Sequence, residues 1–287
     1  MGRTPPLVLA GELNMTWQAL FTWLSWAITL VMFAIAVRMA VKQRTAFYPF
    51  AVLAVAVGAF AEPMYDTAFD LWFFDVHHGR AGAMWSHFTA FGVVQPNWTH
   101  SGYVILYGAV ALYAGRRLYE GRITRAGLLG IWGIEILSSC VFEIIAINRH
   151  VYTYYGPFEL RIFHYPLAVG VLEGTQTLLF TILAVQIWRR VHGWVGLLSL
   201  FIVFPVTMMG INLGLGMPML ISMHLKAGEL STGLVTVMTL VVIASCAAVV
   251  NGAIAFVPRP FAVSEAGGTS PPPAGRSVRQ PLLAAQR

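Results

Sequence analysis

The chain has 287 residues, of which 57% are hydrophobic and 10% charged, and its mean hydropathy is +0.70. Soluble domains carry about 25% charged residues, so the composition excludes an ordinary soluble protein and indicates an integral membrane protein. The net charge is +6. We attribute it to membrane topology, as shown below, and expect no nucleic-acid partner.

Seven apolar stretches are long enough to cross a bilayer, because about 20 helical residues span roughly 30 Å of hydrocarbon. The sequence therefore predicts an all-α, polytopic helix bundle of about seven transmembrane helices, a multi-pass protein of the cell membrane. We expect a loose N-terminal segment at 1–14, a transmembrane domain at 15–257 and a disordered cytoplasmic tail at 258–287, rich in Pro and Gly. The expected spans are Trp17–Val41, Tyr48–Phe69, Gly102–Leu118, Arg125–Ile147, Tyr165–Trp188, Trp194–Leu215 and Leu230–Phe256.

Lysine and arginine concentrate in alternate connections between these spans. Most of the 18 basic residues follow spans one, three, five and seven. Because cytoplasmic loops carry the excess of Lys and Arg, we predict an external N-terminus and a cytoplasmic C-terminus. No basic stretch with a cleavage site precedes the first span, so we expect that span to be retained.

The second span carries carboxyl groups in its outer half. Glu62, Asp66 and Asp70 follow at four-residue spacing, which places them on one face of a helix. A carboxyl group inside a membrane segment is costly and indicates a functional site. Pro63 removes one backbone hydrogen bond and predicts a kink beside Glu62. The alternative for Asp66 and Asp70 is that they are solvated interfacial residues.

The connection after the second span is aromatic and holds four histidines. Their spacing matches no familiar metal-binding set, so we expect no metal and no other cofactor. We interpret the segment as an interfacial lid over the carboxyl groups. The histidines are His77, His78, His87 and His100.

The fourth span contains two more carboxyl groups. Glu135 lies near the bilayer centre and Glu143 about 12 Å further out, at a depth similar to that of Glu62. We expect Arg149, just beyond this span, to pair with one of the carboxylates. Glu135 has the alternative role of a hydrogen-bonded core residue.

Polar residues continue into the fifth and sixth spans. Tyr155, Arg161 and His164 lie in the outer connection, and Glu173 lies a turn or two inside the fifth span. Glu173 thus joins the carboxyl groups of the second and fourth spans at a comparable depth. Asn212, in the sixth span, either bonds into this site or forms an interhelical structural bond.

Two classes of membrane protein are disfavoured by the sequence. Retinal needs a lysine in the last span, and the chain has only Lys42 and Lys226. Many transporters have inverted repeats, and we see no internal repeat here.

Several short motifs between about Phe60 and Gly174 resemble the AveC-like spirocyclase family of actinobacterial membrane proteins. They are Glu62-Pro63, Phe142-Glu143, Asn148-Arg149, Tyr155-Gly156-Pro157 and Tyr165-Pro166-Leu167 leading to Glu173. The resemblance implies a multi-span enzyme that closes spiroketals on polyketide-type substrates, in some members with dehydration. It implies functional roles for Glu62, Glu143, Arg149 and Glu173, whereas Asp66, Asp70 and the His-rich connection depart from the family.

The residues themselves fit this chemistry, because ketal closure needs an acid, a base and protection of a cation from water. We therefore expect a cyclase acting on a lipophilic small molecule in contact with membrane lipid. The alternatives are a terpene cyclase acting on an isoprenoid or its epoxide, and a proton-coupled transporter or lipid-binding protein. The oligomeric state stays open. The candidate catalytic residues are Glu62, Asp66, Glu143 and Glu173, and the candidate substrate-binding residues are Asp70, Arg149, Tyr155, Arg161, His164 and Asn212.

Overall fold

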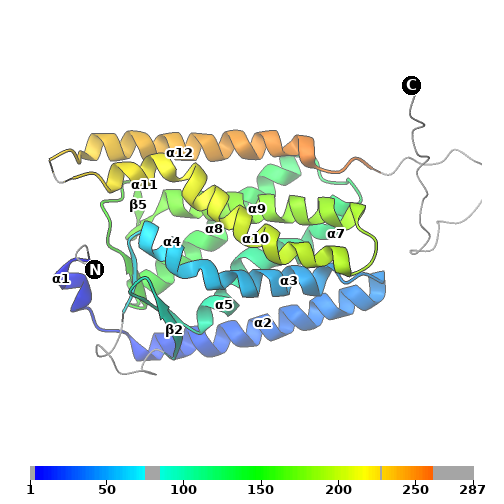
Figure 1. Ribbon diagram of the computed structural model, residues 1–287, viewed down its shortest axis with the longest axis horizontal. Helices are drawn as coiled ribbons and strands as arrows, with labels where there is room; N and C mark the ends of the chain where they lie inside the picture. The colour runs from blue at the N-terminus through cyan, green and yellow to red at the C-terminus, as the bar shows by residue number, and fades with distance from the viewer. Residues whose placement is uncertain (1–3, 75–84, 227, 261–287) are drawn as a thin grey trace, which may run out of the picture.

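The computed structural model describes residues 4–74, 85–226 and 228–260 as a bundle of long, roughly aligned helices (Figure 1). Within these residues, six helices are long and apolar enough to cross a membrane. The predicted helical membrane bundle is therefore confirmed, while the number of spans and their orientation stay predictions. The six segments are Met15–Gln43, Phe47–Ala68, Arg125–Asn148, Leu167–Arg190, Val195–Leu215 and Thr232–Phe256.

The helical elements follow one another along the chain, with the longest connections at 69–97 and 149–166. The first half contains α1 (Pro6–Leu9), α2 (Met15–Gln43), α3 (Phe47–Gly58), η1 (Ala59–Ala61), α4 (Glu62–Ala68), α5 (Trp98–Tyr103), η2 (Val104–Gly108), α6 (Ala109–Tyr113) and α7 (Gly115–Tyr119). The second half contains α8 (Arg125–Asn148), α9 (Leu167–Arg190), η3 (Val195–Ser199), α10 (Leu200–Met209), η4 (Gly210–Leu215), α11 (Met217–Met223), α12 (Thr232–Ala253) and η5 (Ile254–Phe256).

Helix α9 is the centre of the bundle. In its apolar window 89% of the residues are buried, against at most 56% in the other five candidate spans. It packs against α8, α10 and α12, and in Figure 1 it lies between α12 and α3. Most residues of α9, Glu173 among them, are therefore shielded from lipid by the surrounding helices.

The second span is interrupted where the sequence predicts a kink. The α-helix α3 ends at Gly58, a 3-10 turn follows at Ala59–Ala61, and α4 begins with Glu62. Pro63 is tolerated there because a residue in the first turn of a helix needs no N–H partner. Helix α4 ends at Ala68, so Asp70 does not continue the helical face of Glu62 and Asp66 as predicted.

The third predicted span is divided into pieces. Between Trp98 and Tyr119 the chain forms α5, a π-helix (η2), α6 and α7, with Ala114, whose φ is −108°, as a turn residue between α6 and α7. These pieces pack against α2, α3 and α9. The expected helix over Gly102–Leu118 is thus present, but it is segmented and held by its neighbours.

Three short antiparallel strand pairs lie at one end of the bundle, a feature that the all-α prediction omits. Strand β1 (Leu71–Phe73) pairs with β4 (Tyr152–Tyr154), β2 (Ser86–Ala90) with β3 (Val93–Pro96), and β5 (Arg161–Ile162) with β6 (Tyr165–Pro166). The pairs β2–β3 and β5–β6 join neighbours in the chain, whereas β1–β4 joins distant segments.

The N-terminal segment is more ordered than predicted. Within the predicted loose segment 1–14, α1 occupies Pro6–Leu9. The backbone N–H of Asn14 donates to the backbone carbonyl of His150 at 3.1 Å. For the predicted disordered tail, residues 261–287 lie outside the described part of the chain.

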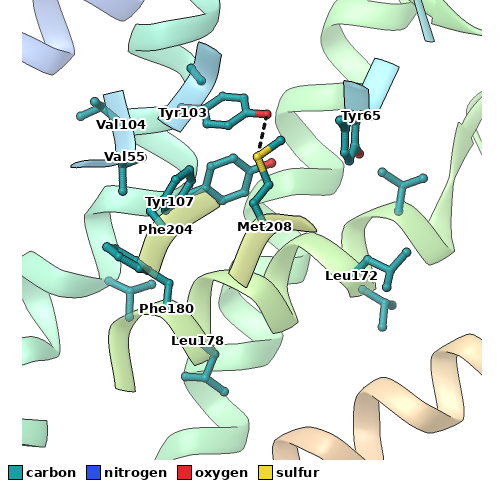
Figure 2. Packing of buried hydrophobic residues seen from close by; sticks show 14 of the residues in the cluster. Val55, Tyr65, Tyr103, Val104, Tyr107, Leu172, Leu178, Phe180, Phe204 and Met208 are labelled. Carbon is teal, nitrogen blue, oxygen red and sulfur yellow. Dashed lines mark hydrogen bonds between the residues drawn. The ribbon is translucent and has the colours of Figure 1, made fainter. Parts of the chain in front are cut away.

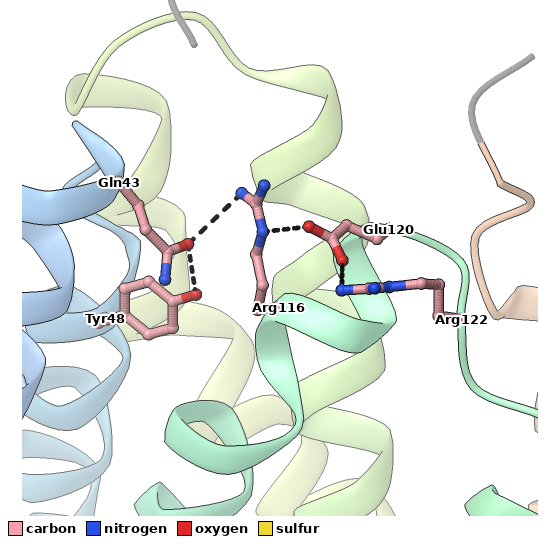
Figure 3. Close-up of polar contacts among 5 residues, drawn as sticks. All are labelled: Gln43, Tyr48, Arg116, Glu120 and Arg122. Carbon is pink, nitrogen blue, oxygen red and sulfur yellow. Dashed lines mark hydrogen bonds and ion pairs between the residues drawn. The ribbon is translucent and has the colours of Figure 1, made fainter. Parts of the chain in front are cut away.

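The opposite end of the bundle carries the predicted concentration of basic residues (Figure 3). Arg116 donates to Glu120 at 2.5 Å and to Gln43 at 3.4 Å, and Arg122 also pairs with Glu120. Tyr48 donates to the same Gln43 oxygen at 2.8 Å. The end of α2 is thereby tied to α7, which brings two of the basic connections together.

Helices α3 and α10 touch through a glycine. A Cβ atom at Gly58 would lie 2.1 Å from the Phe204 ring. We expect Gly58→Ala to lower the free energy of unfolding by about 1–3 kcal/mol, because overpacking forces the two helices apart. Thermal unfolding in detergent micelles measures this effect. The control is Gly133→Ala, where no atom lies within 4 Å; equal melting temperatures for the two variants would contradict the prediction.

Candidate functional site: a buried carboxyl cluster

Four of the predicted carboxyl groups come together inside the bundle. Glu62 and Asp66 extend from α4, Glu143 from α8 and Glu173 from α9, and each side chain is buried. Glu62, Glu143 and Glu173 line one cavity. These four residues form what we call the carboxyl cluster.

The cavity is small and lined mainly by aromatic rings. Its volume is about 30 Å³, and since a single water needs roughly 10–15 Å³ of such volume, it holds about two waters. The packing of two of its tyrosines, Tyr103 and Tyr107, against Phe204 appears in Figure 2. The aromatic lining residues are Tyr65, Phe73, Trp98, Tyr103, Tyr107, Phe142, Tyr152 and Tyr154.

Glu173 is held by four hydroxyl donors. Its Oε1 accepts from Tyr107 at 2.9 Å and Tyr65 at 3.1 Å, while Oε2 accepts from Tyr165 at 3.2 Å and from Ser139. An ionised carboxylate is an acceptor only, with about four lone-pair sites. Four donors use all of these sites, so the surroundings of Glu173 suit the carboxylate anion.

Glu62 and Asp66 lie one turn apart on α4 with both carboxyl groups buried, and two neighbouring buried carboxyl groups favour a proton on one of them. Tyr103 donates to Glu62, and the Gln95 amide donates to Asp66 Oδ2 at 2.6 Å. In the described residues no lysine or arginine forms an ion pair with either carboxyl group. This half of the cluster is therefore suited to holding a proton.

Glu143 has spare hydrogen-bonding capacity. Among the described residues, Glu143 Oε2 and the Tyr152 hydroxyl are both buried without a partner in hydrogen-bond geometry, and both residues line the cavity. Unpartnered buried polar atoms cost roughly 1–3 kcal/mol each. Two of them beside one cavity suit a site that binds a polar group there.

Strand pairing positions the tyrosines that face Glu143. The register sets Leu71 opposite Tyr154 and Phe73 opposite Tyr152, so alternate residues of both strands line the cavity. Burial raises the pKa of Tyr152 and Tyr154 well above the usual value, and the nearby Glu143 carboxyl raises it further. Both phenols therefore stay protonated and serve as donors.

Two predicted substrate-binding residues lie away from the cluster. Arg149 is exposed and its guanidinium stacks over Trp17 at 4.9 Å, so the predicted ion pair with a carboxylate is wrong; α8 ends at Asn148 and its last turn directs Arg149 outward. Asp70 has a φ of 50° just beyond α4 and contacts His224, with 3.6 Å between Oδ1 and Nε2.

The remaining candidates also lie outside the cavity. The Tyr155 hydroxyl accepts from Thr4 at 3.4 Å. Arg161 and His164 line a separate surface pocket, described below. Asn212 donates to Gln176 on α9 at 2.6 Å, which matches the interhelical alternative.

Glu135 likewise has its alternative role, that of a hydrogen-bonded core residue. It accepts from Tyr113 at 2.8 Å and does not line the cavity.

Sequence reasoning missed most of the hydroxyl groups that surround the carboxylates. Tyr103 and Tyr107 are four residues apart and share a helix face, a signal as regular as that of Glu62 and Asp66. Tyr152 and Tyr154 alternate along a strand. Ser139 carried no signal, because its role depends on the packing of α8 against α9.

The described part of the His-rich connection covers the cluster through Gln95. His87 Nδ1 lies 3.0 Å from the Gln95 carbonyl and His100 Nδ1 lies 2.7 Å from the Ala56 carbonyl. Their Nε2 atoms are 2.7 Å apart, too close for a metal ion between them. His77 and His78 lie outside the described residues.

Acid is expected to loosen the hairpin that β2 and β3 form. Burial lowers the pKa of His87, and the neighbouring His100 ring lowers it further. As the pH falls, His87 is therefore protonated in the unfolded segment before it is protonated in the folded one. The free energy with which His87 anchors β2 to β3 is lost as the pH falls below about 6.5. We expect amide exchange in β2 and β3, corrected for intrinsic rates, to rise up to about tenfold between pH 7 and pH 5. If His87→Gln showed the same pH dependence of amide exchange, His87 would not be its cause.

Within the described residues, no group of three or more His, Cys, Asp or Glu side chains is arranged to hold a metal ion. Comparisons of the chain with protein-family models, with curated protein sequences and with solved structures found no match. The resemblance to the AveC-like family therefore stays a prediction, and the function is argued from the carboxyl cluster.

Proposed function

We propose that the chain is an integral membrane cyclase that uses the carboxyl cluster as acid and base to close a spiroketal on a lipophilic, polyketide-like substrate. One observation carries the proposal. A carboxylate with four hydroxyl donors, Glu173, and a carboxyl group with an unpartnered oxygen, Glu143, line one cavity together.

Ring closure would proceed from a hemiketal of a dihydroxy-ketone. Glu143, as the acid, protonates the hemiketal hydroxyl; the carbon–oxygen bond breaks, water leaves and an oxocarbenium ion remains. The second hydroxyl of the substrate then attacks this carbon and returns its proton to the Glu143 carboxylate. The acid is regenerated, and the net change is the loss of one water.

Glu173 supports this sequence as a fixed negative charge. Its hydroxyl donors hold it in place, so it can stabilise the cation without reorganising. The aromatic walls add cation–π stabilisation and exclude bulk water that would capture the cation. Since the cavity holds about two waters, its walls must separate to admit the substrate.

The aromatic walls also favour a second candidate, a terpene cyclase that protonates an isoprenoid alkene or epoxide. A carbocation from such a substrate has no lone pair to share its charge, so it depends more on aromatic faces. The carboxyl roles would be the same.

Metabolite profiling of the native host tests the proposal. The host would carry either the intact gene or the double variant Glu62→Gln, Glu143→Gln. Equal protein levels would be confirmed by immunoblot. We expect the variant to accumulate an uncyclised hydroxy-ketone, whereas a linear isoprenoid would assign the second candidate. An unchanged product set with altered uptake or export of a compound would overturn both and indicate a transporter.

A further inference from the structure

A second, larger pocket opens at the strand end of the bundle. Its volume is about 370 Å³, more than ten times that of the cavity at the carboxyl cluster. Phe74, Ile147 and Tyr154 give it an apolar wall, and the other lining residues are polar. We call it the outer pocket. A pocket of this size and mixed character suits a small polar group attached to an apolar chain.

The polar lining is rich in hydrogen-bond donors. It consists of Asn148, His150, Thr153, Arg161 and His164, with no acidic residue among the lining residues. Within the described residues, the Thr153 hydroxyl and the rings of His150 and His164 have no hydrogen-bond partner in the chain. A histidine ring donates in both of its protonation states, so these donors are available to a ligand.

Arg161 supplies a fixed positive charge to this pocket. Its guanidinium donates to the carbonyls of Tyr154 at 3.0 Å, Gly156 at 2.6 Å and His164 at 2.7 Å, which immobilises it. Burial lowers its pKa, and Glu159 opposes this shift. A partly desolvated cation of this kind gains from an anion brought beside it.

The backbone around the pocket is strained. His150 has a φ of 56° and His164 a φ of 70°. Both values lie in the left-handed region, which residues other than glycine seldom adopt. Such conformations cost of order 1–3 kcal/mol and concentrate at ligand sites. Here the strained residues are the two that bring their imidazole rings to the pocket.

One residue joins the outer pocket to the carboxyl cluster. Tyr154 lines both spaces, and its hydroxyl lies 3.5 Å from that of Tyr65, which donates to Glu173. A molecule held in the outer pocket therefore touches a side chain that also lines the cavity of the carboxyl cluster.

We propose that the outer pocket binds the carboxylate or phosphate group of a lipophilic molecule, with Arg161 and the donors of His150, Thr153 and His164 as its partners. This inference rests on the proposed function in one respect: the anchored molecule is the cyclase substrate, whose reacting part passes Tyr154. An anionic lipid headgroup offers the same chemistry and is the other source of such a group.

Binding to the intact protein in nanodiscs of uncharged phosphatidylcholine tests the proposal without any turnover. The probes are dodecyl phosphate, dodecanoate and, as the uncharged match, dodecanol. We expect the two anions to bind at least about tenfold more tightly than dodecanol, and His150→Gln, His164→Gln to remove most of this preference. Thr153→Val is a second variant that leaves the charges intact and should weaken both anions severalfold. His192→Gln, at the opposite end of the bundle, is the matched control.

Equal affinity for dodecanol and the anions would overturn the proposal, as would unchanged anion binding in both pocket variants when their melting temperatures match the wild type. Competition with phosphatidic acid distinguishes the two sources. Displacement of dodecyl phosphate assigns the pocket to a lipid headgroup, and retained binding assigns it to the acid group of the substrate. Anion binding together with an unchanged metabolite profile would leave the pocket in place and remove the cyclase.

Discussion

Glu143→Gln is expected to lower cyclised product by about 10²- to 10⁴-fold, the usual contribution of a positioned general acid. The amide keeps the shape of the side chain but has no proton of the required acidity. Helix α8 provides a matched control, because Glu135 is buried to the same extent, 6% exposed for both residues, and lies outside the cavity. Glu135→Gln should leave product formation near the wild-type rate.

The measurement is product formed per mole of purified protein in nanodiscs, with the accumulated linear compound as substrate. Equal losses in Glu143→Gln and Glu135→Gln would indicate that any buried amide disturbs α8, and would remove Glu143 as the acid. A loss confined to Glu143→Gln supports the assigned role.

Glu173→Ala is expected to cause a large loss of stability, about 3–5 kcal/mol. The substitution leaves the four hydroxyl donors without their acceptor, and each unsatisfied buried group costs roughly 1–3 kcal/mol, with partial relaxation. Removing one donor is milder, so Tyr107→Phe should cost about 1 kcal/mol. Thermal or denaturant unfolding in micelles measures both.

The comparison between these variants tests the network itself. If Glu173→Ala were no more destabilising than Tyr107→Phe, the hydroxyl groups would not depend on Glu173 for their hydrogen bonds. Thr177→Val is a useful control one turn along α9, because its hydroxyl bonds only to the Glu173 carbonyl.

The depth of the carboxyl groups could be predicted from the sequence, whereas their partners could not. A rise of 1.5 Å per residue fixes how far Glu143 lies along its span relative to Glu135, and the apolar stretches fix where each span begins. Depth says nothing of rotation about the helix axis. Arg149 shows the consequence, because it lies at the right depth and points away from the cluster, over Trp17.

The same limit explains Asp70 and the tyrosines. The four-residue spacing assumes a helix that continues, but α4 ends at Ala68. Tyr152 and Tyr154 line the cavity beside Glu143 only because β4 pairs with β1, which lies about 80 residues earlier in the chain. Pairing between distant short strands carries almost no local sequence signal, so these donors emerge only with the fold.

The segmented helix from Trp98 to Tyr119 bears on the order in which the protein is assembled. Backbone groups freed by a π-helix cannot be left against lipid, so this segment needs protein on its flanks. It packs against α2 and α3, which are made before it, and against α9, which is made after it. During synthesis it must therefore wait for α9, and a nascent chain released at Asn148 would leave it without the central helix that completes its surroundings.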